Sequence, residues 1–338
     1  MRVWALLGAR AGDNNQVLAL AEALGLPFEI KQVEYNSLRR LGPRLLGASL
    51  ASLTSASRSA ITSEPPPHLT LSVGHRSVAV VRALKRRSGG RIRAIHIGFP
   101  RVAPRWFDLV ITTPQYPIAD QPNVLRLPYS LSRARTAAHP TADAQCLAEF
   151  PAPRRLVIVG GPTLYWNIDK ATLLARFGAL GTDAREKGGS LLVTTSPRTP
   201  DRIRSALAAA LSDTAAPTLF ALPGTPPAYA SLLNAADEIH VTADSVAMIS
   251  DAIWTGKPLA LIPIASTMLG RLAMTIANLR RNRLLYPRDL RAFWRALAEI
   301  GITERPAVPR TSPTEVMDAV LQRVRPILDH LCVENAGP

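Results

Sequence analysis

The sequence predicts an α/β protein with two consecutive domains, each built on a mostly parallel β-sheet. Three observations predict this. Short apolar runs typical of buried strands alternate with amphipathic stretches typical of helices almost throughout the chain. At 338 residues, the chain is also longer than most single domains. Finally, residues 129–153 are polar, rich in Ala and interrupted by prolines, as expected of an interdomain linker.

The first domain is expected to cover residues 1–150, with the linker included. The apolar run at residues 3–7 predicts its first strand, and the helix predicted at residues 14–24 ends at Gly25. Residues 45–68 are rich in Ala and Ser and end in three prolines, so we interpret them as a helix and a loop. Further strands are expected at residues 28–33, 69–73, 92–97, 109–112 and 124–127, with a helix at residues 78–86.

The second domain is expected to cover residues 151–338. Its strands are predicted at residues 156–159, 190–194, 218–222, 238–241 and 259–262. Its helices are predicted at residues 171–185, 201–211, 229–235 and 245–254, followed by trailing helices near 267–281, 288–300 and 313–331. The trailing helices are expected to pack against the second domain or to return to the first. Two Rossmann-like domains joined by a linker describe a GT-B arrangement, with the ligand in the cleft between the domains. The structural alternative is one large doubly wound sheet.

The composition is that of a globular chain. It is 47% hydrophobic and 5% aromatic. No apolar run is long enough to span a membrane, and residues 1–8 read as a strand rather than a signal peptide. Cys146 and Cys332 lie far apart, and the six histidines form no pair with metal-ligand spacing. We therefore expect a cytoplasmic protein with no metal site built from its own side chains.

The net charge of +15 is concentrated in the first half. Residues 1–150 carry 19 Lys and Arg against 9 Asp and Glu, and one cluster contains Arg39, Arg40 and Arg44. Such clusters suit an anionic membrane surface, which would make the protein peripheral to the inner membrane, or a phosphorylated acceptor. The alternative is that the arginines only solvate helix faces. Nucleic acid is not expected as a partner, because no aromatic residues interleave the basic clusters.

Three loops of the second domain follow predicted strands and are expected to line one crevice. Carboxyl ends of parallel strands meet at one edge of a sheet, and the helix after the third loop directs free N–H groups there. Small residues, hydroxyls and one guanidinium at such an edge suit a nucleoside diphosphate that carries a sugar. The alternative is an ordinary set of α/β loops. The candidate donor-binding residues are Gly160, Gly161, Thr163, Thr195, Ser196, Arg198, Thr242, Asp244 and Ser245.

Several common motifs are absent from the sequence. Neither Gly-x-Gly-x-x-Gly nor Gly-x-x-x-x-Gly-Lys-[Ser/Thr] occurs, which disfavours dinucleotide redox chemistry and P-loop hydrolysis. No Asp-x-Asp occurs, which disfavours a nucleotide-sugar held through a metal ion. We therefore expect a metal-independent site in which cationic and dipolar groups stabilise the leaving diphosphate, with no cofactor besides the nucleotide-sugar substrate.

The loop after the first strand carries the candidate acceptor-side residues. Asp13 lies at or near the start of the following helix, where it would cap the helix or act as a general base. Another strand-loop-helix junction contains His75, an alternative base or an ordinary loop histidine. The candidate acceptor-side residues are Gly12, Asn14, Asn15, Gln16 and Gly74.

With these residues in hand, the chain resembles a family of bacteria and plants whose plant member is the elongated-mitochondria fission factor. The resemblance spans roughly residues 1–265. Its most specific stretch is Val241-Thr-Ala-Asp-Ser-Val-Ala-Met-Ile-Ser250, in which Ala247 and Asp251 replace a Ser and a Glu that are usual in the family. The other matching stretches are Gly12-Asp-Asn-Asn-Gln16, Leu71-Ser-Val-Gly-His75, Ile97-Gly-Phe-Pro100, Val159-Gly-Gly-Pro162 and Thr195-Ser-Pro-Arg-Thr-Pro200.

The family is similar to GT-B glycosyltransferases. This resemblance implies a donor-site helix that starts at Asp244 and Ser245, with Gly160, Gly161 and Arg198 around the donor. It implies that Asp13 belongs to an acceptor-side loop. We therefore expect a glycosyltransferase that moves a sugar from a nucleotide-sugar to a cell-envelope glycan or glycolipid. The alternatives are a nucleotide-sugar epimerase or hydrolase on the same fold, and a non-enzymatic scaffold for protein partners like the plant factor.

Overall fold

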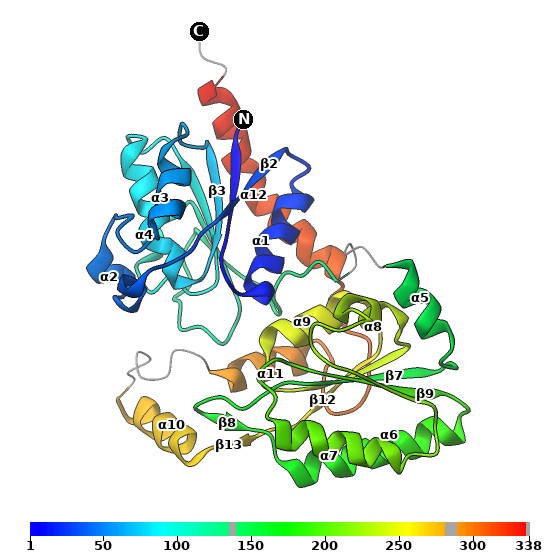
Figure 1. The fold of residues 1–338 in the computed structure, drawn as a ribbon. Coiled ribbons are helices and arrows are strands. Elements are labelled where there is room, and N and C mark those ends of the chain that lie inside the picture. The colour runs from blue at the N-terminus through cyan, green and yellow to red at the C-terminus, as the bar shows by residue number, and fades with distance from the viewer. Residues whose placement is uncertain (135–139, 281–288, 336–338) are drawn as a thin grey trace. The chain divides into compact units, whose positions relative to one another are not determined.

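The computed structural model describes residues 1–134, 140–280 and 289–335, which form two compact units. Unit 1 contains Met1–Arg133 and Thr314–Pro338, and unit 2 contains Ala134–Pro313. Each unit has its own parallel sheet, as Figure 1 shows, with unit 1 in blue, cyan and red and unit 2 in green to orange. The described residues form no sheet common to both units, so the alternative of one continuous doubly wound sheet is wrong.

The described part of unit 1 contains a six-stranded sheet in the order β2-β1-β3-β4-β5-β6. All neighbours are parallel, and Val3 lies opposite both Phe28 and Leu69. Figure 1 shows α1 on one face of this sheet and α3 and α4 on the other. The elements before the linker are β1 (Val3–Leu7), α1 (Ala11–Ala23), β2 (Phe28–Gln32), η1 (Ser37–Arg40), α2 (Pro43–Leu46), α3 (Ser55–Thr62), β3 (Leu69–Val73), α4 (Gly74–Arg87), β4 (Arg93–Ile97), η2 (Pro104–Trp106), β5 (Leu109–Thr112) and β6 (Val124–Arg126).

The core of unit 1 lies where these helices cover the sheet. Every residue of β1 is buried, because helices cover both of its faces, as is usual for a central strand of a parallel sheet. Trp4 and Leu6 of β1 pack into the same apolar cluster as Val80 and Leu84 of α4. Burial of these large side chains fixes α4 against β3 and thereby fixes the start of α4 at the carboxyl edge of the sheet.

The C-terminal helix α12 (Pro313–Asn335) belongs to unit 1, although most of unit 2 separates it from β6 in sequence. Val316, Val320 and Val324 are buried at a spacing of four residues, which places them on one face of the helix. Arg323 donates a hydrogen bond to the Pro122 carbonyl before β6. The predicted domain bounds assigned this helix to the second domain, whereas the structure has the alternative, a return to the first.

The described part of unit 2 contains a five-stranded parallel sheet in the order β10-β9-β7-β11-β12. Figure 1 shows α6 and α7 on one face and α8 and α9 on the other. The elements are α5 (Thr141–Ala148), β7 (Arg154–Val159), β8 (Trp166–Asn167), α6 (Lys170–Glu186), β9 (Ser190–Thr195), α7 (Asp201–Ser212), β10 (Thr218–Ala221), α8 (Tyr229–Ala235), β11 (Glu238–Thr242), α9 (Val246–Trp254), β12 (Leu259–Ile262), β13 (Ala265–Ser266), α10 (Met268–Arg280) and α11 (Leu290–Glu299).

A separate two-stranded sheet in unit 2 supports the loop after β11. Strands β8 and β13 pair antiparallel, and the ring of Trp166 meets the ring of Trp294 edge-on, with centroids 4.8 Å apart. Trp294 also donates its indole N–H to the Ala243 carbonyl, with an N···O distance of 2.9 Å. Helix α11 and the β8–β13 pair thus hold the backbone that connects β11 to α9.

The stretch predicted to be a linker is partly helical. The division between the units falls after Arg133, and α5 lies within residues 129–153. The carboxylate of Asp143 is buried and accepts hydrogen bonds from the Ala228 N–H (2.8 Å) and the Ser231 hydroxyl (2.7 Å). These contacts attach α5 to the start of α8, so this segment is packed against unit 2.

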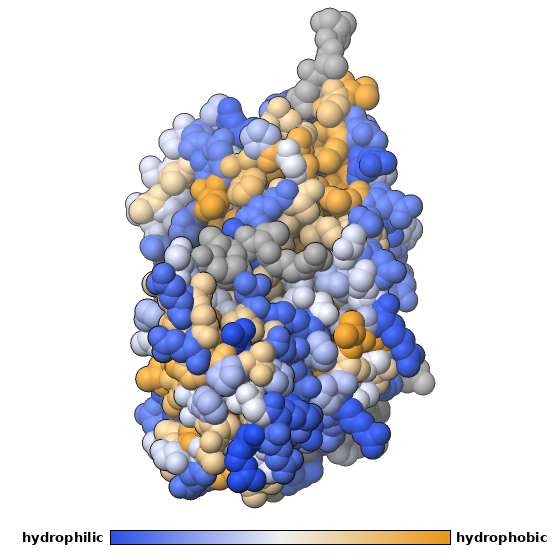
Figure 2. Space-filling view, turned by 90° about the vertical axis from the view of Figure 1, so that its right-hand side faces the viewer, coloured by the Kyte–Doolittle hydropathy of each residue, from blue (hydrophilic) through white to orange (hydrophobic). Residues whose placement is uncertain are grey.

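Hydrophobic side chains also remain at the surface. On the side of the molecule drawn in Figure 2, they gather on unit 1 near the end of α12, among many hydrophilic residues.

Within the three described ranges, no helix combines the length and the apolar character needed to cross a lipid bilayer.

Candidate functional site

The predicted donor loops meet at the point where the strand order of unit 2 reverses. Strand β7 is followed by β9 and β10 on one side, whereas β11 and β12 continue on its other side. The loop after β7 and the loop after β11 therefore diverge from adjacent strands at the carboxyl edge of the sheet. Ligands of open α/β sheets bind at such a switch point.

The carboxylate of Asp244 joins all three loops. Its Oδ2 accepts the Gly161 N–H at 3.1 Å and a guanidinium N–H of Arg198 at 3.2 Å. Its Oδ1 accepts the Thr242 hydroxyl at 2.6 Å, and the Thr242 hydroxyl oxygen accepts the Gly160 N–H at 2.7 Å. The loops after β7, β9 and β11 therefore form one hydrogen-bonded cluster.

The two glycines of the first loop are required by this close approach. A β-carbon at Gly160 would overlap the Asp244 carboxylate, and a β-carbon at Gly161 would overlap the backbone of Arg198. The absence of a side chain at both positions thus lets the loops touch through backbone and polar atoms.

The charged pair of the cluster is buried on one side only. The Asp244 side chain is 1% exposed, whereas the Arg198 side chain is 48% exposed. Burial raises the pKa of the Asp244 carboxyl, and the hydrogen bonds from Thr242 and Gly161 and the charge on Arg198 oppose this rise. The buried Asp244 therefore orients the guanidinium of Arg198. Because that guanidinium is half-exposed, a ligand can reach it.

Arg198 is also held by its own loop. One guanidinium N–H donates to the Gly161 carbonyl at 3.2 Å, and the Arg198 backbone N–H donates to Ser196 Oγ at 3.1 Å. The hydroxyl of Thr199 contacts the carbonyl oxygens of Val159 and Gly160 at 3.0 and 2.5 Å. Thr199 was not among the predicted residues, although it lies in the Thr-Ser-Pro-Arg-Thr-Pro stretch, which could have pointed to it.

The remaining predicted donor residues have mainly local roles in the structure. Thr163 closes the turn before β8, because its hydroxyl oxygen accepts the Trp166 N–H at 3.1 Å. Ser245 is the N-cap of α9 and accepts the Met248 N–H. The buried hydroxyl of Thr195 has no hydrogen-bond partner within the described part of the chain.

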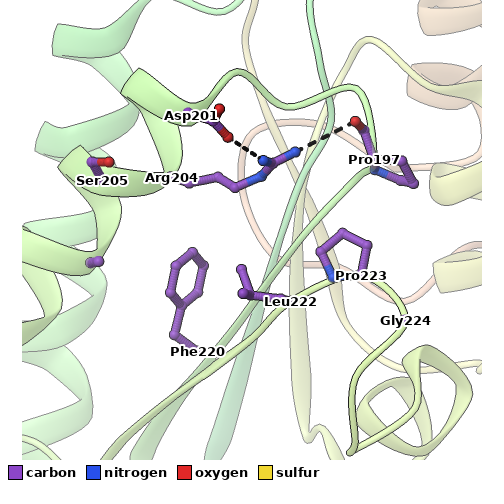
Figure 3. A pocket seen from close by; sticks show the side chains of 9 residues that line it. Pro197, Asp201, Arg204, Ser205, Phe220, Leu222, Pro223 and Gly224 are labelled. Atoms are coloured by element: carbon purple, nitrogen blue, oxygen red, sulfur yellow. Dashed lines mark hydrogen bonds and ion pairs between the residues drawn. The ribbon is translucent and has the colours of Figure 1, made fainter.

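A groove adjoins this cluster on the side of β10. Its volume is about 690 Å³, which lies in the range of small-molecule sites. Figure 3 shows that α7 forms one wall and the end of β10 the other, and that Arg204 bonds to Asp201 and to the Pro197 carbonyl. Apolar lining comes mainly from Phe220 and Leu222. Sequence reasoning missed this groove, because its residues lie apart in the chain and form no motif.

Unit 1 has its own switch point between β1 and β3. Strand β2 lies on one side of β1, and β3 to β6 follow on the other. The helices that follow β1 and β3 are α1 and α4. Asp13 is in the first turn of α1, and its Oδ2 lies 3.8 Å from the place of a β-carbon on Gly74, the first residue of α4. Gly74 has a φ of +72°, and half-buried His75 follows it directly.

Asp13 lies in the first turn of α1, near the predicted position, but the N-cap residue is Arg10. The helix begins at Ala11, and the side chain of the N-cap residue Arg10 makes no capping hydrogen bond. Asn14 instead closes the loop, because its side-chain amide donates to the Gly8 carbonyl and accepts the Gly8 N–H, both at 2.8 Å. Asp13 is half-buried in the first turn, where the positive helix end stabilises a carboxylate.

The other acceptor-side residues share this helix turn. Gln16 donates to the Gly12 carbonyl at 3.3 Å, and Asn15 is half-buried beside it. The structure therefore brings Asp13, Gly74 and His75 to one switch point. It also shows that Asn14 and Gln16 are bonded to the backbone of their own loop.

A fully buried histidine lies beneath this region. His96 of β4 contacts Ser72 of the neighbouring strand, with Oγ 3.0 Å from Nδ1, and its ring lies 4.7 Å from that of Phe107. Burial, with a smaller effect from the charge on His75, lowers the pKa of His96 to about 3. His96 is therefore neutral near pH 7.

This low pKa predicts an acid-sensitive stability. An unfolded chain protonates His96 below about pH 6.5, whereas the folded chain does so only near pH 3. The contribution of neutral His96 to the free energy of unfolding is thus fully present above pH 6.5 and is lost as the pH falls towards 3. In the parent protein, His96 should lower the free energy of unfolding by about 2 kcal/mol between about pH 7 and pH 5. We expect the His96→Gln variant to lack this decrease. Urea unfolding of both proteins at each pH measures this, and equal losses would contradict it.

Comparisons with known proteins agree with this fold. The chain matches the mitochondrial fission ELM1 family over residues 11–307. It is 22% identical over 296 residues to an uncharacterized protein of Rickettsia prowazekii (strain Madrid E), which covers 77% of this chain and 82% of that protein.

Two solved structures share the fold of the chain. The UDP-GlcNAc 2-epimerase from Methanocaldococcus jannaschii is 10% identical, with a TM-score of 0.54 and coverage of 96% of this chain and 99% of that one. The S. aureus MnaA structure with UDP is 12% identical, with a TM-score of 0.53 and coverage of 97% of both chains. The predicted GT-B class with two Rossmann-like domains is confirmed, as is the predicted family. The chain belongs to the mitochondrial fission ELM1 family.

Proposed function

We propose that this protein is a glycosyltransferase that moves a sugar from a nucleotide-sugar to a cell-envelope glycan or glycolipid. The observation that carries the proposal is the cluster at the switch point of unit 2, where three loops present one oriented, half-exposed guanidinium. In support, two solved structures that share the fold are described as a UDP-GlcNAc 2-epimerase and as a complex with UDP.

The donor diphosphate binds Arg198 and the free N–H groups at the start of α9. Arg198 makes charge-assisted hydrogen bonds to phosphate oxygens, and the positive end of α9 adds to the attraction. Asp244 is a positioning residue, since its buried carboxylate fixes the guanidinium but does not face the ligand. The small loop residues Gly160 and Gly161 leave room for the phosphates.

The nucleoside part of the donor occupies the groove beside this cluster. Pro197 lines the groove and directly precedes Arg198, so the groove adjoins the loop that carries the guanidinium. Phe220 and Leu222 offer an apolar surface for a base, while Asp201 and Ser205 offer partners for hydroxyl groups. This combination suits an aromatic base attached to a sugar.

The reaction breaks the bond between the sugar C1 and the diphosphate oxygen and forms a bond between C1 and an acceptor hydroxyl oxygen. The leaving nucleoside diphosphate keeps the electron pair, and Arg198 stabilises its charge. Asp13 of unit 1 takes the proton of the acceptor hydroxyl as general base, with His75 as the alternative. The proposed reaction uses no metal ion or further cofactor, because the sequence has no Asp-x-Asp to hold one.

An epimerase or hydrolase of the same nucleotide-sugar is the second candidate. The epimerase with the same fold favours it. Product analysis separates the two, since an epimerase changes the donor sugar in the absence of any acceptor, and a hydrolase releases free sugar. A scaffold for protein partners would bind no donor at all.

Donor binding is tested by thermal unfolding in the presence of UDP-, GDP-, CMP- and dTDP-sugars. A ligand that binds only the native state adds about 2.7 kcal/mol of stability at 100 times its dissociation constant. We expect one nucleotide class to raise the unfolding temperature at concentrations where the others do not. If none of the four classes stabilises the protein, the proposed function is wrong and the scaffold becomes the better explanation.

A further inference from the structure

Unit 1 exposes a short apolar segment between β2 and α3, defined here as the Leu/Arg segment, residues 37–46. It consists of η1, the turn at Leu41 and Gly42, and α2. Leu38, Leu41 and Leu45 are 40%, 42% and 79% exposed. Single exposed leucines are ordinary, whereas three within eight residues concentrate apolar side chains in one short exposed segment, as interaction sites do.

Cations alternate with these leucines. Arg39, Arg40 and Arg44 are exposed, and none of them has an ion-pair partner among the described residues. Residues 35–107 carry 13 Lys and Arg against a single acidic residue, Glu64. Glu64 is occupied by Lys31, whose Nζ lies 2.7 Å from its carboxylate. The segment is therefore apolar and cationic, with no acidic side chain of its own.

The segment is held in place by the body of unit 1. The Asn36 side chain donates to the carbonyls of Ala51 (2.8 Å) and Leu53 (2.9 Å) and accepts the Leu38 N–H at 2.9 Å. Pro43, at the start of α2, is buried, and α2 packs against α4. Because the backbone is already ordered, little conformational entropy is lost when its side chains bind a surface.

The hydrophobic surface near the end of α12 is different in charge. Figure 2 shows this face, and α12 carries exposed Asp318 and Asp329 as well as Arg325. Both signs of charge lie along that helix, so it attracts neither an anionic nor a cationic partner strongly. The Leu/Arg segment carries cations only, so it complements an anionic surface better than α12 does.

We propose that the Leu/Arg segment docks this protein on an anionic lipid surface. The leucines enter the boundary between headgroups and acyl chains, and the arginines bind lipid phosphates. This proposal deepens the proposed function and rests on it for the setting, since a glycolipid acceptor lies in such a surface. The docking itself requires no donor, so the two proposals can be tested separately.

The test is sedimentation of the full-length protein with vesicles of phosphatidylcholine alone or mixed with phosphatidylglycerol. We expect binding to the mixed vesicles only, weakened by added salt because exposed charges are screened. Replacing Arg39, Arg40 and Arg44 together by Gln should weaken binding about 100-fold, because each arginine lost weakens it about fivefold. Leu45→Ser should weaken it about tenfold.

Two controls match these variants. Arg86→Gln with Arg87→Gln removes charge at the end of α4, away from the leucines, and Val308→Ser removes an exposed apolar side chain (57% exposed) from unit 2. Both should bind nearly as well as the parent protein. Equal binding to the two kinds of vesicle, or unchanged binding by the segment variants, would overturn the proposal.

The unfolding temperature of every variant is measured with and without the stabilising nucleotide-sugar. An unchanged temperature shows that a segment variant is folded, and loss of lipid binding alone then supports docking. Failure of lipid binding with intact donor stabilisation counts against docking only. Intact lipid binding without stabilisation by any donor counts against the proposed function only.

Discussion

Replacement of Asp13 by Asn is expected to lower turnover by about 10²–10⁴-fold, the usual contribution of a general base. The amide has nearly the shape of the carboxylate but cannot take the proton from the hydroxyl of the acceptor substrate. Asp13 is not the N-cap residue of α1, and Asn14 closes the loop, so the local backbone should persist. The free energy of unfolding should fall only by about 0.3–1 kcal/mol, the attraction between the carboxylate and the positive end of α1. Donor affinity should not change, because the proposed donor residues belong to unit 2.

Turnover is measured as nucleoside diphosphate released from the stabilising nucleotide-sugar in the presence of bacterial membrane vesicles as the source of acceptor. Asp120→Asn is the matched control, since it removes one carboxylate from unit 1 at a side chain that is 90% exposed. Near-normal turnover of Asp13→Asn would show that Asp13 only stabilises the start of α1 and is not the general base. His75→Ala would then be the next variant to measure.

Replacement of Arg198 by Ala is expected to weaken donor binding about 10- to 150-fold, which corresponds to about 1.5–3 kcal/mol for hydrogen bonds to a charged group. The half-exposed guanidinium is the only part of the ion pair with Asp244 that a ligand reaches. Asp244→Asn should weaken binding in the same direction but less, because Arg198 stays in the loop through its bond to the Gly161 carbonyl.

Titration calorimetry with the stabilising nucleotide-sugar measures these affinities. Arg202→Ala is the matched control, because Arg202 is an exposed arginine on the neighbouring helix α7. It should bind the donor as the parent protein does. If Arg198→Ala and Asp244→Asn also bind normally, the cluster is a structural feature of the fold and does not form the donor site.

The strands could be predicted well from sequence, while the starts of α1 and α4 could not. Strands β1, β3, β5 and β12 have the predicted bounds, because each is an apolar run that ends in polar or small residues. Helix α1 begins three residues before the predicted start, since the polar residues of its first turn read as a loop. Their side chains bond to the backbone nearby, as Asn14 does with Gly8.

The same contrast holds for the site. The motifs around Gly160, Arg198 and Asp244 identified the right loops, because strand ends of a parallel sheet meet at one edge. Sequence could not show that Asp244 is buried and faces the loops, since this depends on how closely Gly160 and Gly161 approach it. The groove along α7 and the place of α12 depend on packing between distant residues, which no local pattern records.

The place of α12 has a consequence for how the chain matures. Unit 1 is discontinuous in sequence, because Met1–Arg133 must be joined by Thr314–Pro338. Val320 and Val324 of this last part are fully buried. During synthesis, unit 2 is therefore complete as a single stretch of chain before the final helix of unit 1 has left the ribosome. Until then, the apolar surface that α12 covers stays open, and a chaperone has its longest opportunity to bind there.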